Sequence, residues 1–178
     1  DAILIGEATC SGDLISPNTY RDFVVPYHTR LVEEIGGPSI LHICGRSTGH
    51  IPYIAQTGVT GYNFDEGVDL PLAQEHLKGK VSLIGYVPTV EVLLQGTPEL
   101  VYQASLECLG NGMDILTPGC SLPQHTPMEN IAAMHQAARD WAEDPAIPAN
   151  PPQVIAGLKP QAAAASGRKR ERKHRRRK

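Results

Sequence analysis

The chain has 178 residues, 41% of them apolar and only 5% aromatic, so we expect a domain with an aliphatic core. Its net charge of −3 is uneven: residues 168–178 hold nine of the sixteen Lys and Arg, and the remainder has seven against eighteen Asp and Glu. The acidic body disfavours a nucleic-acid enzyme, and no membrane-length apolar run or signal peptide is visible. Because Asp1 leads directly into an apolar run, we expect the chain to start inside a larger protein.

Short apolar segments alternate with segments of helical periodicity over residues 1–142. The expected strands are 2–6, 39–43, 60–64, 81–85 and 113–117, and the expected helices are 17–35, 47–57, 70–77, 97–109 and 127–141. A helix between each pair of strands indicates a parallel α/β sheet covered by helices. The pattern fits both a doubly wound sheet and part of a (β/α)8 barrel. Both architectures place their functional residues after the carboxyl ends of the strands.

The segment 143–178 has a different composition, rich first in proline and alanine and then in basic residues. It shows no periodicity, and we predict that it is a largely disordered tail. The polybasic part, 168–178, would allow binding to nucleic acid or another anionic surface. The alternative is that this tail has no function.

The segment His42-Ile43-Cys44-Gly45 is the main candidate for chemistry. At the end of a strand, residues i and i+2 face the same side, so the imidazole and the thiol would point toward one site. Cys120 follows the last expected strand and is a candidate third ligand. Three such ligands leave the fourth position of a zinc ion open, as catalytic zinc sites require. The alternative is a hydrogen-bonded histidine with cysteines packed in the core. The wide spacing of the four cysteines disfavours disulfides and favours a reducing, cytoplasmic setting.

Four segments resemble the C-terminal half of the methylcobamide:coenzyme M methyltransferases, a branch of the uroporphyrinogen decarboxylase superfamily. They are 11–31, 41–45 (LHICG), 81–98 and 114–134, and the resemblance covers residues 1–142. It implies about five strands of a (β/α)8 TIM barrel, with Zn²⁺ held by His42, Cys44 and Cys120. It also implies methyl transfer from a methylcobamide on a corrinoid partner protein to a thiol such as coenzyme M, or to a pterin in some relatives.

Further candidate residues follow the expected strands. Glu7 is a candidate fourth zinc ligand, and Asp65, Tyr86 and His125 are candidates for the substrate pocket. Tyr86 stands where the relatives carry Asn. Each of these residues has a plainer alternative as a solvated or packed loop residue, and Cys10 and Cys108 are expected to pack in the interior. Two other functions remain open: tetrapyrrole decarboxylation, which does not need zinc, and an inactive fragment whose tail binds nucleic acid.

Overall fold

The computed structural model describes residues 1–144 and 154–157. Five strands form one parallel sheet in chain order: β1 (Ile3–Gly6), β2 (Ser39–Ile43), β3 (Gly61–Phe64), β4 (Ser82–Val87) and β5 (Ile115–Pro118). A doubly wound sheet reverses its strand order at a switch point, whereas consecutive parallel strands joined by helices are the arrangement of a (β/α)8 barrel. The expected fold, part of such a barrel, is therefore confirmed.

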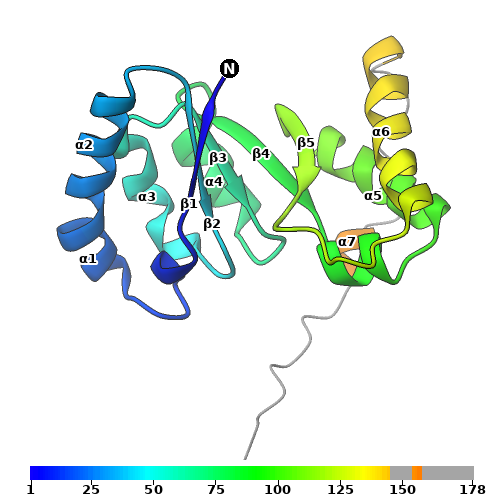
Figure 1. The fold of residues 1–178 in the computed structure, drawn as a ribbon, viewed down its shortest axis with the longest axis horizontal. Coiled ribbons are helices and arrows are strands. Elements are labelled where there is room, and N and C mark those ends of the chain that lie inside the picture. The colour runs from blue at the N-terminus through cyan, green and yellow to red at the C-terminus, as the bar shows by residue number, and fades with distance from the viewer. Residues whose placement is uncertain (145–153, 158–178) are drawn as a thin grey trace, which may run out of the picture.

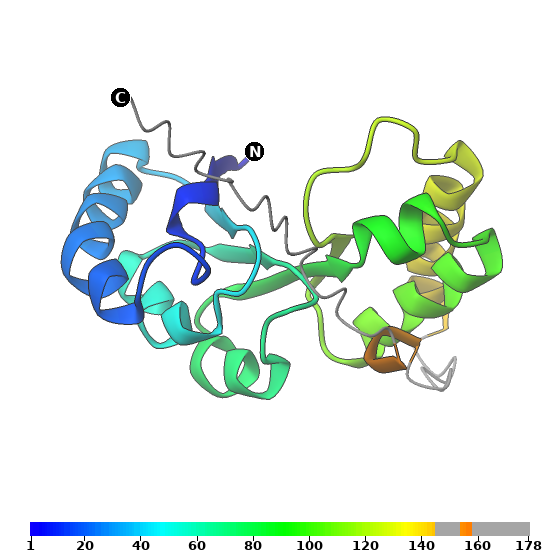
Figure 2. The ribbon, with the colours of Figure 1, turned by 90° about the horizontal axis from the view of Figure 1, so that it is seen from below.

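The helices lie on the outer side of the sheet, as Figures 1 and 2 show. The longer ones are α2 (Val25–Ile35), α4 (Leu70–Leu77), α5 (Pro98–Gly110) and α6 (Met128–Glu143). Shorter ones are α1 (Pro17–Thr19), α3 (Ile51–Ile54) and α7 (Val154–Gly157), with the turns η1 (Ala8–Cys10), η2 (Tyr20–Val24), η3 (Thr48–His50), η4 (Ala55–Thr57) and η5 (Thr89–Leu94). None of the helices in the described ranges is long and apolar enough to cross a membrane.

Side-chain caps fix where three of these helices begin. The side chains of Ser16, Asp69 and Thr97 each accept a hydrogen bond from a backbone N–H of the first turn, at 3.0–3.3 Å. A proline lies one or two residues after each cap, within the first turn, where its missing N–H costs nothing. These local signals explain why the expected helix starts agree closely with the structure.

The expected helix 17–35 is continuous but changes its winding. Residues 20–24 form a π-helical turn, η2, between α1 and α2. Pro26 lies two residues after the end of this turn and has no N–H to donate to the carbonyl four residues earlier. A local widening of the helix before the proline accommodates the lost hydrogen bond without ending the helix.

Three elements were not expected from the sequence. They are η1, η5 and α7, and the last lies within the segment 143–178 that was predicted to be largely disordered. Residues 154–157 instead form α7, because the Glu107 carboxylate accepts hydrogen bonds from the backbone N–H groups of Val154 and Ile155 at 2.8 and 3.1 Å. α7 packs against α5. The rest of the expected tail from residue 145 onward, including the polybasic segment 168–178, lies outside the described residues.

The two faces of the sheet have different roles. Leu41, Ile43, Tyr62 and Phe64 are fully buried, or nearly so, in the core cluster between the strands and the helices. Strand alternation turns the intervening residues, His42 among them, toward the opposite face. The metal-ligating candidate of β2 therefore lies on the inner face of the partial barrel.

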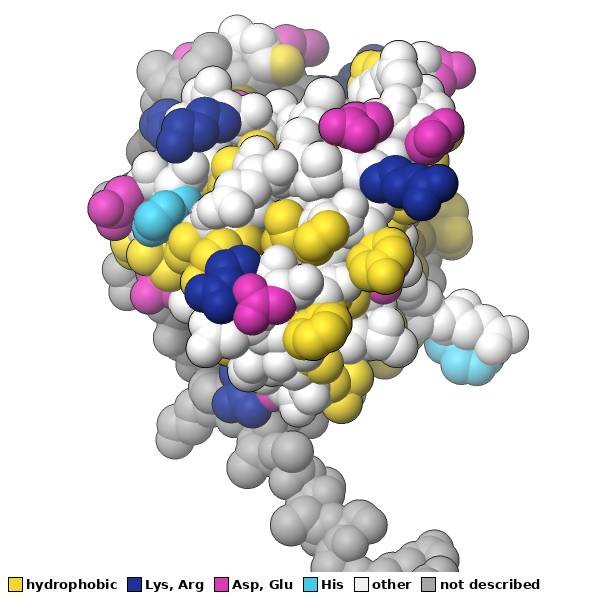
Figure 3. Space-filling model, turned by 90° about the vertical axis from the view of Figure 1, so that its left-hand side faces the viewer, with side chains coloured by type: hydrophobic (Ala, Val, Ile, Leu, Met, Phe, Trp, Pro, Cys, Tyr) yellow, Lys and Arg dark blue, Asp and Glu magenta, His cyan; other side chains and the backbone are white. Residues whose placement is uncertain are grey.

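Self-association is an expected property of this chain. β1 and β5 form the two edges of the described sheet, and Figure 3 shows apolar side chains on the outer face near α1 and α2. Phe23 and Tyr27 there are 70% and 72% exposed. We expect sedimentation velocity to show species that grow with protein concentration, and the double variant Phe23→Ser/Tyr27→Ser to shift them toward monomer. A monomer at all concentrations would contradict this expectation.

Candidate metal centre

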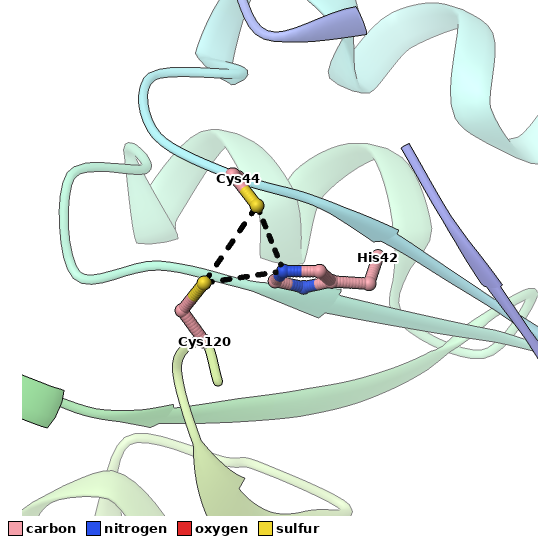
Figure 4. A group of neighbouring side chains, drawn as sticks. All are labelled: His42, Cys44 and Cys120. Carbon is pink, nitrogen blue, oxygen red and sulfur yellow. Dashed lines mark hydrogen bonds between the residues drawn. The ribbon is translucent and has the colours of Figure 1, made fainter. Parts of the chain in front are cut away.

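Three ligating side chains from two distant parts of the chain meet at the carboxyl end of the sheet (Figure 4). His42 lies near the end of β2, Cys44 follows that strand, and Cys120 follows β5. The Cys44 Sγ lies 3.2 Å from the His42 Nε2 and 3.6 Å from the Cys120 Sγ, and the Cys120 Sγ lies 3.5 Å from the same nitrogen. The structure thus brings together the three residues predicted as metal ligands.

The spacing of these three atoms matches the edges of a zinc tetrahedron. Bonds of about 2.3 Å to sulfur and about 2.0 Å to nitrogen place two sulfurs about 3.8 Å apart and a sulfur about 3.5 Å from a nitrogen. The observed separations lie within about 0.3 Å of these values. Two thiols and one imidazole are also a donor set that zinc prefers, so the residues fit the ion.

The orientation of the His42 ring is set by its other nitrogen. Nδ1 lies 3.3 Å from the backbone carbonyl of Asn63, which can only accept a hydrogen bond. The proton of the neutral imidazole therefore belongs on Nδ1, and the lone pair of Nε2 faces the two sulfurs. Metal-binding histidines typically show this arrangement, because the outer hydrogen bond fixes the tautomer and the ring plane.

The side chain of Asn63 supports the segment that carries Cys120. Its Nδ2 lies within hydrogen-bonding distance of the Thr117 Oγ1 at 3.0 Å and of two carbonyls, Ile84 at 3.2 Å and Pro118 at 3.3 Å. One amide thus joins β3 to both β4 and β5 just below the cluster. Sequence analysis missed Asn63, although a polar residue within the apolar strand GYNF signals a need for buried hydrogen-bond partners.

Asp65 holds the segment that carries Cys44. Its Oδ2 accepts a short hydrogen bond from the backbone N–H of Gly45, and burial raises the pKa of this carboxyl. Asp65 was predicted as a pocket residue, but its carboxylate is engaged in this loop contact.

Burial, together with the hydrogen bond and charge of Cys120, raises the pKa of Cys44 to about 11. A cation in the cluster would oppose this shift by stabilising the thiolates.

A cavity of about 290 Å³ lies on the inner face of the sheet beside the cluster. Its lining includes two of the three cluster residues and is otherwise mainly apolar: Leu4, Ile40, His42, Asn63, Ile84, Thr117, Pro118, Cys120 and Ser121. A small molecule in this cavity would therefore contact both the cluster and an apolar wall.

Glu7, predicted as a fourth ligand, does not belong to this group. Its carboxylate lies beside Cys10 and His28, on the side of the sheet that faces α2. The reason is strand alternation: Glu7 follows Ile5 by two residues, and Ile5 is buried in the core against the helices, whereas Leu4 lines the cavity. The prediction that Glu7 completes the site is corrected accordingly.

Tyr86 and His125 do not line the cavity either. Tyr86 is buried, its ring stacks near Phe64 at 5.8 Å between centroids, and its hydroxyl accepts a hydrogen bond from the Asn111 side chain at 3.1 Å. It fills the space between β4 and the end of α5, which corrects its assignment to the substrate pocket. His125 is exposed in the loop between β5 and α6. Cys108 is buried in α5, as expected.

Substitution of Gly45 tests how strongly metal binding depends on the conformation of the loop that carries Cys44. Its φ is +67°, and an added Cβ would lie 2.8 Å from the Asp13 Oδ2. We expect Gly45→Ala to cost about 1–3 kcal/mol of stability and to weaken metal binding, because Cys44 must shift. Gly36→Ala is the matched control: its φ is +62°, but the nearest atom is 4.0 Å away and belongs to the helix α2 terminus. Equal metal affinities in both variants, measured by competitive chelation, would contradict the expectation.

Comparison with known proteins shows which family this chain resembles. Residues 1–141 match the family model of uroporphyrinogen decarboxylase (URO-D). A methylated-thiol–coenzyme M methyltransferase of Methanosarcina mazei is 37% identical over 138 residues, covering 78% of this chain and 37% of the relative. A methylcobamide:CoM methyltransferase of Methanosarcina acetivorans is 33% identical over 144 residues, covering 79% of this chain and 42% of the relative. Uroporphyrinogen decarboxylases also match, at 26–32% identity.

The fold has a counterpart among solved structures. A methyltransferase from Methanosarcina mazei aligns with a TM-score of 0.76 and 28% sequence identity, covering 80% of this chain and 42% of that one. The chain spans about two fifths of the length of the methyltransferases it matches. The matched family model covers most of this chain, and the fold agrees with it. The chain therefore belongs to the uroporphyrinogen decarboxylase family, and it resembles the methylcobamide:CoM methyltransferases within it.

Proposed function

We propose that this chain carries the zinc site of a corrinoid-dependent methyltransferase, in which a thiol such as coenzyme M accepts a methyl group from a methylated corrinoid protein. The observation that carries this proposal is the cluster of one imidazole and two thiols at tetrahedral spacing beside an apolar cavity. A pterin is the alternative acceptor. The setting is a reducing cytoplasm, because the two thiols must stay unpaired to act as ligands.

His42, Cys44 and Cys120 would hold the ion and leave one coordination position for the substrate thiol. When bound there, Zn²⁺ lowers the pKa of a thiol so that the nucleophilic thiolate is available near neutral pH. The proton of the acceptor thiol would go to solvent, and its sulfur would form a bond to the methyl carbon to give a thioether. The cobalt–carbon bond of the methylated corrinoid would break, and its electron pair would stay on the corrinoid of the partner protein.

The remaining residues of the site act on the ligands or on the substrate. The Asn63 carbonyl keeps the His42 lone pair directed at the ion, and Asp65 keeps the Cys44 loop in place. The apolar lining excludes water from the reacting sulfur, which favours attack by a poorly hydrated thiolate. In this proposal residues 1–142 form the functional unit, and the polybasic segment has no part in methyl transfer.

Tetrapyrrole decarboxylation is the rival function within the same family. It requires neither a zinc ion nor two thiols converging on an imidazole. The cluster of His42, Cys44 and Cys120 therefore favours methyl transfer, since a decarboxylase would gain nothing from this arrangement.

The proposal is tested by adding coenzyme M to the chain loaded with Co²⁺, which substitutes spectroscopically for Zn²⁺. Binding of a third thiolate should strengthen the sulfur-to-cobalt charge-transfer absorption and release about one proton per chain. The hydroxyl analogue, 2-hydroxyethanesulfonate, is the matched control and should change neither signal. If coenzyme M and the control give the same spectrum, the cluster is not a thiol-binding centre.

A further inference from the structure

A second group of ligating side chains lies under the end of β1, on the helix side of the sheet. Glu7 follows β1, Cys10 ends the turn η1, and His28 lies in α2. The Cys10 Sγ is 3.5 Å from the Glu7 Oε2, and the His28 Nε2 is 3.6 Å from the Glu7 Oε1. One ligand atom from each residue lies within 4.8 Å of the other two. Methyl transfer as proposed above uses none of the three.

The His28 ring shows that this group is incomplete as a purely hydrogen-bonded cluster. Its side chain is only 4% exposed, and Nε2 is a buried atom without a hydrogen-bond partner. The 3.6 Å separation from Glu7 is longer than a normal N–H···O hydrogen bond. Buried polar atoms are almost always partnered in native proteins, so an unpartnered nitrogen directed at a thiol and a carboxylate points to a missing ligand.

The other nitrogen of this ring repeats the arrangement seen at His42. The His28 Nδ1 lies 3.3 Å from the Tyr20 hydroxyl, a buried group held by stacking of its ring on His50 at 4.5 Å. When the hydroxyl oxygen accepts a hydrogen bond from Nδ1–H, the Nε2 lone pair faces Glu7 and Cys10. This outer hydrogen bond is what orients a histidine toward a metal ion.

We propose that Glu7, Cys10 and His28 form a second binding site for a divalent metal ion of the zinc class. Around a tetrahedral zinc ion, a thiolate sulfur and a carboxylate oxygen lie about 3.6 Å apart, and an oxygen and a nitrogen lie about 3.4 Å apart. The observed separations are close to these values: 3.5 Å from the Cys10 Sγ to the Glu7 Oε2, and 3.6 Å from the His28 Nε2 to the Glu7 Oε1. They end on the two oxygens of one carboxylate, so a bound ion would take one of these oxygens or both. A mixed sulfur, nitrogen and oxygen donor set selects zinc-like ions over Ca²⁺ or Mg²⁺.

The position of the site determines what the ion does. Its ligands join the loop after β1 to α2, so a bound ion would fasten the first strand of the sheet to its covering helix. The Glu7 side chain is 30% exposed, which leaves water access to the fourth coordination position. The site is therefore a structural metal site. It is separate from the His42 cluster and independent of the proposed methyl transfer.

Titration of the metal-free full chain with Co²⁺ tests the second site. We expect two equivalents to bind, and Cys10→Ala to bind one while keeping the spectrum of the two-thiolate cluster. The double variant Cys44→Ala/Cys120→Ala should also bind one equivalent, with about half the charge-transfer intensity of Cys10→Ala because one thiolate remains in place of two. Cys108→Ala is the matched control, since it removes a buried thiol outside both groups and should leave two equivalents.

A second readout does not depend on the spectrum. Added Zn²⁺ should raise the melting temperature of the double variant Cys44→Ala/Cys120→Ala, and this rise should disappear when Cys10→Ala is added. A single equivalent that binds to the parent chain and survives Cys10→Ala overturns the proposal, as does a second equivalent that survives this substitution. If His28→Gln folds, it should lose the second equivalent as Cys10→Ala does. If His28→Gln does not fold, the result for Cys10→Ala alone decides.

Discussion

Replacing either Cys44 or Cys120 by alanine is expected to weaken zinc binding at the His42 cluster by more than about 100-fold. Removal of an outer-shell partner typically costs about 10–100-fold in metal affinity, so loss of a direct ligand must cost more. Each variant would leave one thiol and one imidazole as protein ligands of the ion. Water would then fill the remaining coordination positions. Competition with a chromophoric chelator measures this affinity, with Cys10→Ala as the background so that only one site is counted.

The same variants should lose the stability that the ion provides. Zinc at about 1,000 times its dissociation constant contributes about 4 kcal/mol to the folded state, and a 100-fold weaker affinity would leave about 1.4 kcal/mol, so we expect either variant to lose about 2.7 kcal/mol or more. The matched control is Cys108→Ala, which removes a thiol buried in α5 and should lower stability without changing zinc affinity. An affinity unchanged in Cys44→Ala or Cys120→Ala would remove the basis of the proposed function.

The strands and most helices were predictable because their signals are local. Caps and prolines at Ser16-Pro17 and Thr97-Pro98 determine where helices begin, and apolar runs determine the strands. The alternation of β2 also predicted that His42 and Cys44 face the same site. Cys120 was a candidate third ligand because it follows the last expected strand, and the resemblance implied the same ligand set. The spacing along the chain could not show that residues 76 positions apart are in contact.

The errors at Glu7 and Tyr86 share one cause. The rule that functional residues follow strand ends does not state which face of the sheet a side chain takes. For Glu7 the alternation of side chains along β1 could have decided the face. Ile5, two residues earlier, lies on the face that packs on the helices, so Glu7 lies on that face too. For Tyr86 the contacts that decide come from Phe64 and Asn111, which are distant in the sequence.

Interactions that depend on a single buried polar atom could not be predicted from the sequence. His28 could not be singled out from the sequence, because its helical position alone does not reveal that it lies beside Glu7. Likewise, the contact between Glu107 and the start of α7 joins segments separated by a stretch without periodicity. Long-range polar contacts of this kind follow from tertiary packing and leave little trace in local pattern.

Asn63→Leu is expected to weaken both the fold and the metal centre. The substitution removes the donor to a carbonyl within β4 and to a hydroxyl and a carbonyl at the end of β5, and unsatisfied buried groups cost about 1–3 kcal/mol. The segment that carries Cys120 loses its tie to β3, so we expect metal affinity to fall about 10–100-fold, as for other outer-shell residues. Denaturant unfolding of the metal-free chain and chelator competition measure the two effects separately.

Asn130→Leu is the matched control for this prediction. Asn130 is a buried residue of α6 whose Nδ2 donates hydrogen bonds to the carbonyls of Leu93 and Gly96, both at 2.9 Å, without contact to the cluster. Its replacement should lower the free energy of unfolding by a similar amount and leave metal affinity unchanged. If the two variants weaken metal binding equally, the effect of Asn63 is a general loss of stability. If only Asn63→Leu weakens it, one amide that joins three strands positions the third metal ligand.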